Sequence, residues 1–559
     1  MSLEQSIRKF ALLNAVKHKG KANPGALVGQ LIQEDPKVKD NMKKIMPLIQ
    51  KIVKEINSLD FEKQKEIINT EFPELLEKKT EERDIFAFLK LDPKQKVNTA
   101  YPPGPEKYPH LGHAKASIIN YELAKKHKGK FILRFEDTNP RLVKKEFYDI
   151  IQDNLKWLGV KWDELVYASD HIDFFYEQAE KVIEQDDAYM CTCNPDQIRD
   201  GRMNGNPCNC RKKDSKQNMK EWKELFKAPE GSAILRLKID LAHKNSTMRD
   251  PTIFRIIEEP HARHKTKYRV WPNYDFQNAI MDAKNDIDMR IRSKEFEMRS
   301  ELQRHIQKIL NLKITSTYEI GRFNLEGVPS SGRVIRELVN EGKLLGWDDP
   351  SLQTLVAVKR RGFQPQAIKD FVLSTGLTKS ESTLTWDDII MHNKRLLDKE
   401  ALRYFFIEDP VEITIEGAPE QNIQLNLHPE FPEKGFRKYK TNTKFLITKK
   451  DYDNIKDKEI IRLMDCLNFT KQKDKLIFHS LDYKDFKGKG KKIIHFLPQQ
   501  PDLTDTEILM PNKKVKTGKA SPYINKLKPN IVIQFERTGF VRLDKIEKKD
   551  KKYMFWFTH

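Results

Sequence analysis

Strand-like and helical segments alternate over residues 93–320, and this alternation is the strongest constraint on the fold. KFILRFEDTNP has the pattern of a strand that ends in polar residues, KKEFYDIIQDNLKWLG that of a helix, and KWDELVYASD that of a return strand. Such alternation is typical of a parallel sheet with crossover helices. These sheets bind ligands at the carboxyl ends of their strands, so we expect the functional site there.

The rest of the chain shows other patterns. Residues 1–92 place apolar residues at helical spacing and predict an N-terminal helical domain. A cysteine-rich loop and GSAILRLKIDL interrupt the alternation, which predicts a subdomain inserted at about 190–265 within the domain 93–320. Residues 321–397 predict a helical connector. From 398 to 559, short alternating segments such as VEITIEG and NIVIQFE are typical of β-barrels. We therefore predict a multidomain protein, α/β in its centre and all-β at its end.

The charge and the cysteine count limit the function classes. The 559 residues include 102 lysines and arginines against 82 acidic residues, a net charge of +20. This surplus favours a polyanionic partner, although charge alone does not separate RNA from DNA or from a role in solubility. No apolar run approaches the roughly 18 residues of a membrane span. Because five cysteines are too few for a disulfide scaffold and no apolar signal core is present, we expect a cytoplasmic protein without a membrane partner.

Two histidines stand at the start of a predicted helix. The strand candidate KVNTAY leads into the proline-rich turn PPGPEKYP, and the helix opens at Leu111 or Gly112. The first amide N–H groups of a helix lack intrahelical partners, so this junction favours an anion. His110 and His113 beside it indicate a phosphate ligand. Two surface histidines without a role are the alternative for an isolated H-x-x-H.

Four of the five cysteines are clustered in CTCNPDQIRDGRMNGNPCNC. Cys191, Cys193, Cys208 and Cys210 form two C-x-C pairs across a loop rich in Gly, Asn and Pro. Four thiolates could close a tetrahedral structural zinc site. The C-x-C spacing is tighter than the usual C-x-x-C, so free cysteines are the alternative. Cys466 stands alone and is predicted to be a core residue.

Several segments, taken in order, resemble one family. PHLGH after a strand and before a helix is similar to the HIGH signature of class I aminoacyl-tRNA synthetases. ALLNAVKHKGKANPGALVG resembles the helical extension of archaeal glutamyl-tRNA synthetases, so the resemblance covers essentially the whole chain. The other segments that resemble the glutamyl/glutaminyl branch, in the family's order, are YPPGPEKYPHLGHAKA, LRFEDTNP, RDPTIFRI, KYRVWPNYDFQNAIMDA, RFNLEGVPSSGRVIRELVNEGKLLGWDDPSL, LLDKEALRYFFIEDP, VIQFERTGFVRLD and FWFTH.

The resemblance implies a fold and a reaction. It implies a Rossmann-type class I catalytic domain with an inserted acceptor-end subdomain, a helical connector and anticodon-binding β-barrels. The implied reaction is the activation of glutamate by ATP, with Mg²⁺ sharing the anionic charge, followed by transfer to the 3′ end of tRNA(Glu). No DNA partner is expected. A glutaminyl-tRNA synthetase shares this architecture, and a catalytically inactive tRNA-binding paralogue is the alternative of another class.

The resemblance also implies an ATP site. His110 and His113 can donate N–H groups to phosphates, and Gly112 leaves room for the nucleotide. In the loop VPSSGRV, Arg333 stands where the family usually has lysine, and it keeps the charge while adding donors. The implied catalytic residues are His110, His113 and Arg333, and the implied ATP-binding residues are Pro103, His110, Gly112, His113, Ser330, Ser331 and Arg333.

The implied amino-acid pocket draws on three segments. Glu136 and Asp137 follow a strand, and Tyr274 lies in YDF; a solvated strand end and a core aromatic are the alternatives. Arg292 aligns with an arginine of glutamyl enzymes that is a small uncharged residue in glutaminyl enzymes. A buried guanidinium favours a carboxylate ligand over an amide. The alternative is a surface arginine paired with a neighbouring glutamate, Glu295 or Glu297.

One position departs from the family. The strand motif normally carries an arginine two residues before the first proline, where it helps to grip the substrate, and this chain has Ala100 there. The loss is consistent with a weaker pocket, with replacement by Arg134, Arg290 or Arg292, or with a degenerate paralogue.

Overall fold

The chain forms two compact units, Met1–Ala87 and Phe88–His559. The computed structural model describes residues 3–17, 20–35, 38, 41–71, 84–329, 331–547 and 551–559. The division between the units falls at Ala87, slightly before the predicted boundary at residue 92.

The first unit is helical and has its own apolar core. Asn23 accepts the backbone N–H of Gly25 and thereby caps the second helix, which starts with a proline at its first position. Apolar side chains from the four helices of its described residues, among them Ile7, Ile49 and Ile56, are buried together. Its helices are α1 (Leu3–Lys17), α2 (Pro24–Glu34), α3 (Met42–Asn57) and α4 (Phe61–Glu71).

The centre of the second unit is a five-stranded parallel sheet in the order β3-β2-β1-β8-β9. Every residue of β2 is buried, as expected for a strand covered on both faces. The chain leaves β1 toward β2 and β3, and it returns on the other side of β1 with β8 and β9. The strands are β1 (Thr99–Tyr101), β2 (Phe131–Phe135), β3 (Glu164–Tyr167), β8 (Met289–Ser293) and β9 (Ser316–Ile320), and the helices that alternate with them are α5 (Leu111–Lys126), α6 (Lys145–Trp157), α7 (Ile172–Glu184), α10 (Tyr274–Lys284) and α11 (Glu297–Ile309).

An insertion between β3 and β8 carries a four-stranded antiparallel sheet. Its strands extend beyond the predicted range 190–265, because they begin at Ala188 and end at Pro272. Its apolar core is continuous with that of α7, α10 and α11, so the insertion does not form a separate core. Its elements are β4 (Ala188–Cys191), α8 (Pro195–Asn204), α9 (Ser215–Leu225), β5 (Ile234–Leu237), β6 (Thr252–Ile256) and β7 (Val270–Pro272).

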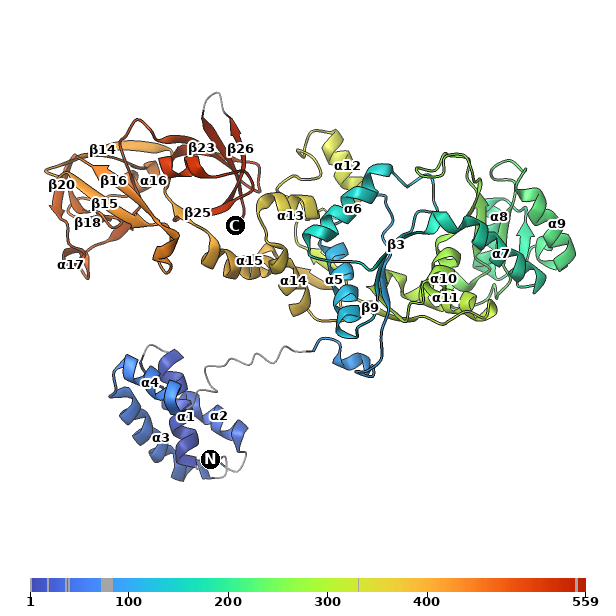
Figure 1. Ribbon diagram of the computed structural model, residues 1–559, viewed down its shortest axis with the longest axis horizontal. Coiled ribbons are helices and arrows are strands. Elements are labelled where there is room, and N and C mark those ends of the chain that lie inside the picture. The colour runs from blue at the N-terminus through green and yellow to red at the C-terminus, as the bar shows by residue number, and fades with distance from the viewer. Residues whose placement is uncertain are drawn as a thin grey trace. The chain divides into compact units, whose positions relative to one another are not determined.

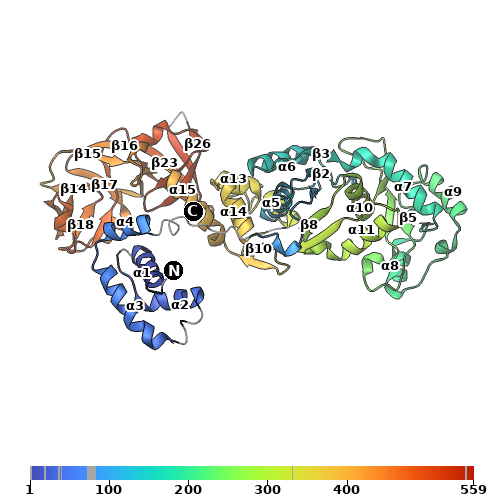
Figure 2. The same cartoon turned by 60° about the horizontal axis from the view of Figure 1, so that its bottom comes forward.

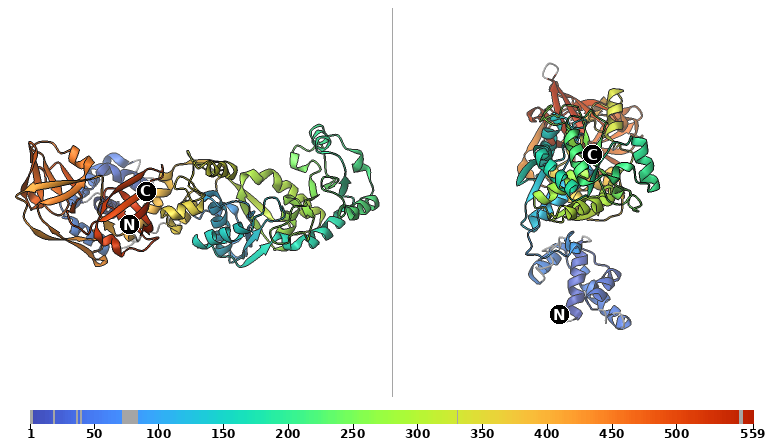
Figure 3. Two further views of the ribbon diagram at one scale, coloured as in Figure 1. Left: turned by 90° about the horizontal axis from the view of Figure 1, so that it is seen from above. Right: turned by 90° about the vertical axis from the view of Figure 1, so that its right-hand side faces the viewer.

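The connector after β9 is mainly helical, as predicted, with one short parallel ladder between β10 and β11. Within the second unit, the insertion and the C-terminal strands lie at opposite ends, and the connector lies beside the C-terminal strands (Figures 1 and 3). Its elements are β10 (Phe323–Leu325), α12 (Gly332–Asn340), α13 (Leu355–Arg361), α14 (Pro365–Ser374), β11 (Ser382–Leu384) and α15 (Trp386–Glu400).

The C-terminal region is all-β and barrel-like, which confirms the predicted fold class. One seven-stranded sheet has the order β12-β25-β26-β27-β23-β24-β13, and the other has the order β21-β18-β19-β20-β14-β17-β22 (Figure 2). Buried and exposed residues alternate in β16, the pattern of a strand with one solvated face. Cys466 lies in the core of the second sheet, as predicted.

The elements of this region are β12 (Arg403–Tyr404), β13 (Phe406–Glu408), β14 (Pro410–Glu416), β15 (Gln421–Asn426), β16 (Phe436–Thr441), β17 (Lys444–Thr448), α16 (Lys449–Asp453), β18 (Ile460–Leu463), β19 (Asn468–Gln472), β20 (Lys475–Ser480), α17 (Tyr483–Phe486), β21 (Lys492–Ile494), β22 (Leu497–Pro498), β23 (Thr504–Leu509), β24 (Val515–Ala520), β25 (Val532–Phe535), β26 (Gly539–Glu547) and β27 (Lys552–Phe557). Among the described residues, no helix has both the length and the apolar character needed to cross a membrane.

Candidate active site

The loop between β1 and α5 begins at the point where the strand order reverses. β1 continues to β2 on one side, while β8 adjoins it on the other. Open α/β sheets bind ligands at this switch point, outside the carboxyl ends of the strands. The helix α5 that follows packs against β1 and β8, which places its N-terminus beside the switch point.

His110 and His113 cap the first turn of α5. Nδ1 of His110 accepts the backbone N–H of Gly112 at 3.0 Å, and Nδ1 of His113 accepts the backbone N–H of His110 at 3.1 Å. A ring nitrogen that accepts a hydrogen bond carries no proton, so each neutral ring carries its proton on Nε2. No other described residue forms a hydrogen bond with either Nε2. Both rings therefore have one N–H donor available at the N-terminus of α5.

Burial keeps these rings neutral. It lowers the pKa of His110 to about 4, with Lys107 and Arg322 acting in the same direction. It also lowers the pKa of His113 well below its usual value. Gly112 makes room for the capping ring, because a Cβ there would lie 2.8 Å from Cε1 of His110. Gly112 is thus needed for the histidine cap, and its contact with a nucleotide stays a prediction.

The loop with Arg333 lies against the same segment. Gly332 lies beside Lys107, and Tyr108 stacks on Trp347 with ring centroids 5.0 Å apart. The cavity between the two segments measures about 10 Å³, the space of about one water molecule, so a nucleotide there would require this loop to move.

The predicted residues of this loop and of the preceding turn differ in exposure. The Arg333 side chain is 84% exposed, and its Nε lies 3.8 Å from Oε1 of Glu337. Ser331 precedes α12 as its exposed N-cap residue. Ser330 lies outside the described residues. The carbonyl of Pro103 accepts the backbone N–H of Glu136 at 3.0 Å, which connects the proline turn to the end of β2.

Glu136 is held by donors of the protein. Arg134, fully buried on β2, donates from Nε to Glu136 at 2.9 Å and from Nη2 to Asp282 at 2.7 Å. Asn278 donates to the same Glu136 oxygen at 3.1 Å, and Gln277 donates to the other. Burial raises the pKa of Glu136, although the charge of Arg134 opposes this shift. The carboxylate is thus engaged by three protein donors.

Asp137 is also fully engaged. Its carboxylate accepts hydrogen bonds from the hydroxyl of Tyr148 at 2.7 Å and from the backbone N–H and hydroxyl of Ser169, both at 2.8 Å. Its carbonyl oxygen lies 2.8 Å from Nε2 of His261. The side chain is completely buried, so in this structure it fixes α6 and the segment after β3 to the end of β2.

Arg292 is buried and incompletely paired. It lies at the carboxyl end of β8 with 5% of its surface exposed. Nη1 donates to Gln303 at 2.8 Å and Nη2 donates to Ser300 at 2.5 Å. Nε lies 3.7 Å from the nearest Glu319 oxygen and makes no hydrogen bond among the described residues. Burial, with a contribution from Arg290, lowers the pKa of this guanidinium.

The alternative of a surface Arg292 is wrong. Glu295 pairs with Arg322, and Glu297 lies 3.9 Å from Lys379. Neither glutamate pairs with Arg292, because β8 directs the Arg292 side chain toward α11 and β9.

Tyr274 is the first residue of α10 and is half-buried. Its ring centroid lies 5.8 Å from that of Phe296 and 5.6 Å from the guanidinium carbon of Arg299. Burial raises its pKa. The hydroxyl makes no hydrogen bond with another described residue, so it keeps a free donor near the end of β8.

The four clustered cysteines converge. Their sulfur atoms all lie within 4.8 Å of one another, and the Cys191–Cys208 and Cys193–Cys210 pairs are each 4.0 Å apart. A tetrahedral zinc with bonds of about 2.3 Å sets its sulfurs about 3.8 Å apart, so this donor set fits the metal. Burial raises the pKa of Cys210, but hydrogen bonds from Thr192 and other nearby groups outweigh it, and the pKa falls to about 7.

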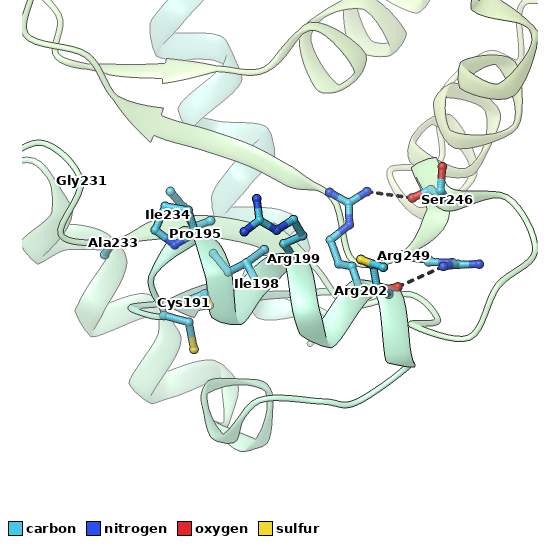
Figure 4. Close-up of a pocket in the computed structure, with 12 residues that line it drawn as sticks. Cys191, Pro195, Ile198, Arg199, Arg202, Gly231, Ala233, Ile234, Ser246 and Arg249 are labelled. Carbon is cyan, nitrogen blue, oxygen red and sulfur yellow. Dashed lines mark hydrogen bonds between the residues drawn. The ribbon is translucent and has the colours of Figure 1, made fainter.

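A cavity of about 550 Å³ opens beside this cluster, between α8 and the sheet of the insertion. Figure 4 shows its arginines: Nη2 of Arg202 donates to the carbonyl of Ser246 at 2.8 Å, and Arg249 donates to the carbonyl of Arg202 at 3.0 Å. Arg199 extends from the same helix. The cavity combines these cations with apolar walls from Ile198 and neighbouring residues.

Comparison with known proteins shows which family this chain resembles. The model of the class I tRNA synthetase (E and Q) catalytic domain matches residues 96–399, and two models of the corresponding anticodon binding domain match 401–483 and 460–544. A glutamate–tRNA ligase of Pyrococcus abyssi is 39% identical over 98% of both chains. The chain belongs to the glutamate–tRNA ligase family. Further members from Pyrococcus furiosus and Methanocaldococcus jannaschii are 38% identical over 98% of both chains and 35% identical over 97% of this chain and 98% of the relative.

This ligase departs from the predicted family pattern at Ala100, which is buried in a small core with Ile132 and Ile287. Of the arginines considered as replacements, Arg134 uses all three of its nitrogens in hydrogen bonds to protein groups. Among the described residues, Arg290 makes hydrogen bonds through Nη1 alone, to Asn278 and Asp282. Arg290 and Arg292 thus keep N–H groups that form no hydrogen bond with a described residue, whereas Arg134 keeps no such nitrogen.

Sequence reasoning missed the polar residues that hold these arginines: Asp282, Ser300, Gln303 and Glu319. A signal exists in α11, where the polar residues Ser300, Gln303 and Gln307 recur at helical spacing on the buried face. Buried polar residues require partners, so this stripe could have predicted charged neighbours. Their identity depends on the pairing of β8 with β9, which the local sequence does not specify.

Proposed function

We propose that this glutamate–tRNA ligase binds ATP and glutamate at the carboxyl edge of its parallel sheet, between β1 and β8, and charges tRNA(Glu). The observation that carries the proposal is Arg292, a buried guanidinium at this edge with an unpaired N–H. An unpaired buried donor is costly unless a ligand satisfies it, and a carboxylate is its best partner.

In the proposed ATP site, His110 and His113 donate their Nε2–H groups to phosphate oxygens. Both rings are neutral, so they act as fixed donors that add to the N-terminal dipole of α5. Pro103 and Gly112 shape the segment, and Ser331 and Arg333 face the nucleotide once the loop before α12 has moved to admit it. Ser330 is assigned to the same site on its place in the sequence motif alone. The exposed Arg333 then follows the charge that develops on the leaving pyrophosphate.

Mg²⁺ would enter with the nucleotide. It prefers carboxylate, water and phosphate oxygens. Glu136 and Asp137, the nearest carboxylates in the motif after β2, are both occupied by protein donors. We therefore expect phosphate oxygens, and not these side chains, to bind Mg²⁺, which would neutralise part of the negative charge of the triphosphate.

In the first step, a carboxylate oxygen of glutamate attacks the α-phosphorus of ATP in line with the departing pyrophosphate. The enzyme contributes positioning and charge stabilisation. Arg292 would bind the second carboxylate of glutamate, and Tyr274 would donate its free hydroxyl to the amino acid. Glu136 and Asp137 act indirectly, because they fix Arg134 and the end of β2. In the second step, a ribose hydroxyl at the tRNA 3′ end attacks the activated carbonyl and releases AMP.

The remaining parts would bind tRNA(Glu). The two sheets after residue 401 correspond to the matched anticodon binding domains, and the insertion would support the acceptor end. A zinc ion held by Cys191, Cys193, Cys208 and Cys210 would stabilise the insertion without taking part in the reaction. We place the enzyme in the cytoplasm, where tRNA charging takes place, and expect no DNA partner.

The test is aminoacylation of total tRNA with each of the twenty labelled amino acids. We expect glutamate to be charged and glutamine to be rejected, because a glutamine amide offers Arg292 one acceptor and a repelled NH₂ group. Preference for glutamine would support the glutaminyl alternative. Absence of any charging or ATP–pyrophosphate exchange would support the tRNA-binding paralogue, the alternative that Ala100 favours.

A further inference from the structure

The helix α13 connects the C-terminal sheet to the histidine loop through hydrogen bonds at both of its ends. It spans seven residues, about 10 Å of helix. Figures 1 and 2 show it between α5 and the sheet that contains β26.

The N-terminal end of α13 holds the loop that carries His110. Thr354, its N-cap residue, forms an isolated antiparallel bridge with His110. The backbone N–H of Leu355 donates to Pro109 at 2.8 Å, and that of Leu111 donates to Gln353 at 3.2 Å. The positions of these backbone groups fix where the capping histidine lies.

The C-terminal end of α13 is bound to the C-terminal sheet. The Arg360 guanidinium donates to both carboxylate oxygens of Asp544 on β26, at 3.0 and 2.8 Å, and lies 4.1 Å from the ring centroid of Trp556. Its third nitrogen donates to Asp348 at 2.5 Å. The next residue, Arg361, donates to the carbonyl of Thr558 at 2.9 Å.

Close packing at this end leaves little freedom for adjustment. Gly362 has a φ of +97°, and a Cβ there would lie 2.9 Å from Thr558 and from Val532. Leu355, Ala357, Val358 and Arg361 of this short helix are buried, so it moves as one body, and a displacement at Arg360 also displaces Thr354.

We propose that Arg360 is a positioning residue for amino-acid activation: through Asp544 it fixes α13 to the C-terminal sheet, and α13 places His110 and His113 for ATP. This inference rests on the proposed phosphate role of the two histidines. Arg360 itself touches no reacting atom. Its effect is on the turnover of the bound substrates, since misplacement of catalytic donors by about 1 Å costs up to a hundredfold in rate.

The test compares Arg360→Ala, Arg360→Lys and Asp544→Asn with wild type in ATP–pyrophosphate exchange with tRNA(Glu) present. We expect kcat to fall roughly tenfold to a hundredfold for Arg360→Ala, with KM for tRNA unchanged. Lysine keeps the charge but cannot donate to both carboxylate oxygens as arginine does, so the kcat of Arg360→Lys should lie between those of wild type and Arg360→Ala. Once Arg360→Ala is made, adding Asp544→Asn should cause a smaller loss than the same change causes in wild type, and the remainder comes from Arg542, which also donates to Asp544 at 2.9 Å.

Lys516→Ala is the matched control. Lys516 has a similar exposure and pairs at 2.7 Å with Glu408, and both residues lie within the C-terminal sheet. All variants are assayed below the unfolding transition of the least stable one. An unchanged kcat for Arg360→Ala, an equal loss in the control, or a loss seen only as a raised KM for tRNA would overturn the inference. A wild-type protein without exchange activity would instead overturn the proposed function, and the inference with it.

Discussion

The two ring nitrogens of His113 have separate tasks, and two substitutions can separate them. Nδ1 accepts the backbone N–H of His110, while Nε2 is the donor that we assign to ATP. The amide of an asparagine reaches the place of Nδ1, and the longer glutamine reaches the place of Nε2. His113→Asn should therefore keep the helix cap and lose the phosphate donor, whereas His113→Gln should do the reverse.

The expected magnitudes differ enough to distinguish these roles. A donor aimed at developing charge contributes about 2.7–4 kcal/mol, so His113→Asn should lower kcat for activation by about 10² to 10³. Loss of a capping hydrogen bond costs about 1 kcal/mol of stability. His113→Gln should show this loss of stability and retain much more of the activity than His113→Asn.

ATP–pyrophosphate exchange in the presence of tRNA(Glu) measures the activation step, and urea unfolding of the same samples measures stability. A variant His113→Asn with wild-type kcat would refute the phosphate role. Equal activity losses in the two variants, each in proportion to its loss of stability, would show that His113 acts only through the cap.

Three further outcomes follow from the site. Arg292→Ala should raise KM for glutamate about thirtyfold to several thousandfold, because an unpaired carboxylate costs about 2–5 kcal/mol, and it should leave KM for ATP unchanged. An unchanged KM for glutamate would contradict the role of Arg292 in binding the amino acid. Metal analysis should find one zinc per chain, and four freely titrating thiols in protein made with ample zinc would exclude it. The pKa of His110 is about 4 in the folded protein and 6.5 ordinarily, so the unfolded chain binds more protons than the folded one between pH 4 and 6.5. The free energy of unfolding therefore falls by up to about 3 kcal/mol as the pH drops from 6.5 to 4. Unfolding of His110→Asn at pH 7 and 5 should lack this part of the pH dependence, and an identical dependence in both proteins would contradict it.

The sequence predicted well those helices and strands whose buried residues follow from the local spacing of apolar side chains. FILRF is apolar except for Arg134 and became the fully buried β2, and the alternating segments after residue 398 became half-solvated strands. The strand, loop and helix around His110 were likewise predicted, because a proline-rich turn between two patterns is a local signal.

The contacts that complete the site could not be predicted in this way. Asp137 meets His261, and Arg292 meets Glu319, only because distant strands and helices pack together. The capping role of the histidines was missed for a different reason, since histidine is not among the usual N-cap residues and needs a glycine two positions later to fit its ring.

The C-terminal sheet joins strands from opposite ends of its region. β13 pairs with β24 and β12 pairs with β25, while the strands between them in the chain form the other seven-stranded sheet and the two-stranded sheet of β15 and β16. During synthesis, β12 and β13 leave the ribosome first and must wait for their partners until residues 515–535 have been made. The intervening sheet has all its strands earlier and can fold while the outer one still exposes two unpaired strand edges. Such exposed edges favour aggregation, so late folding of this sheet, and not the assembly of the parallel sheet, should set the demand of this chain for chaperones.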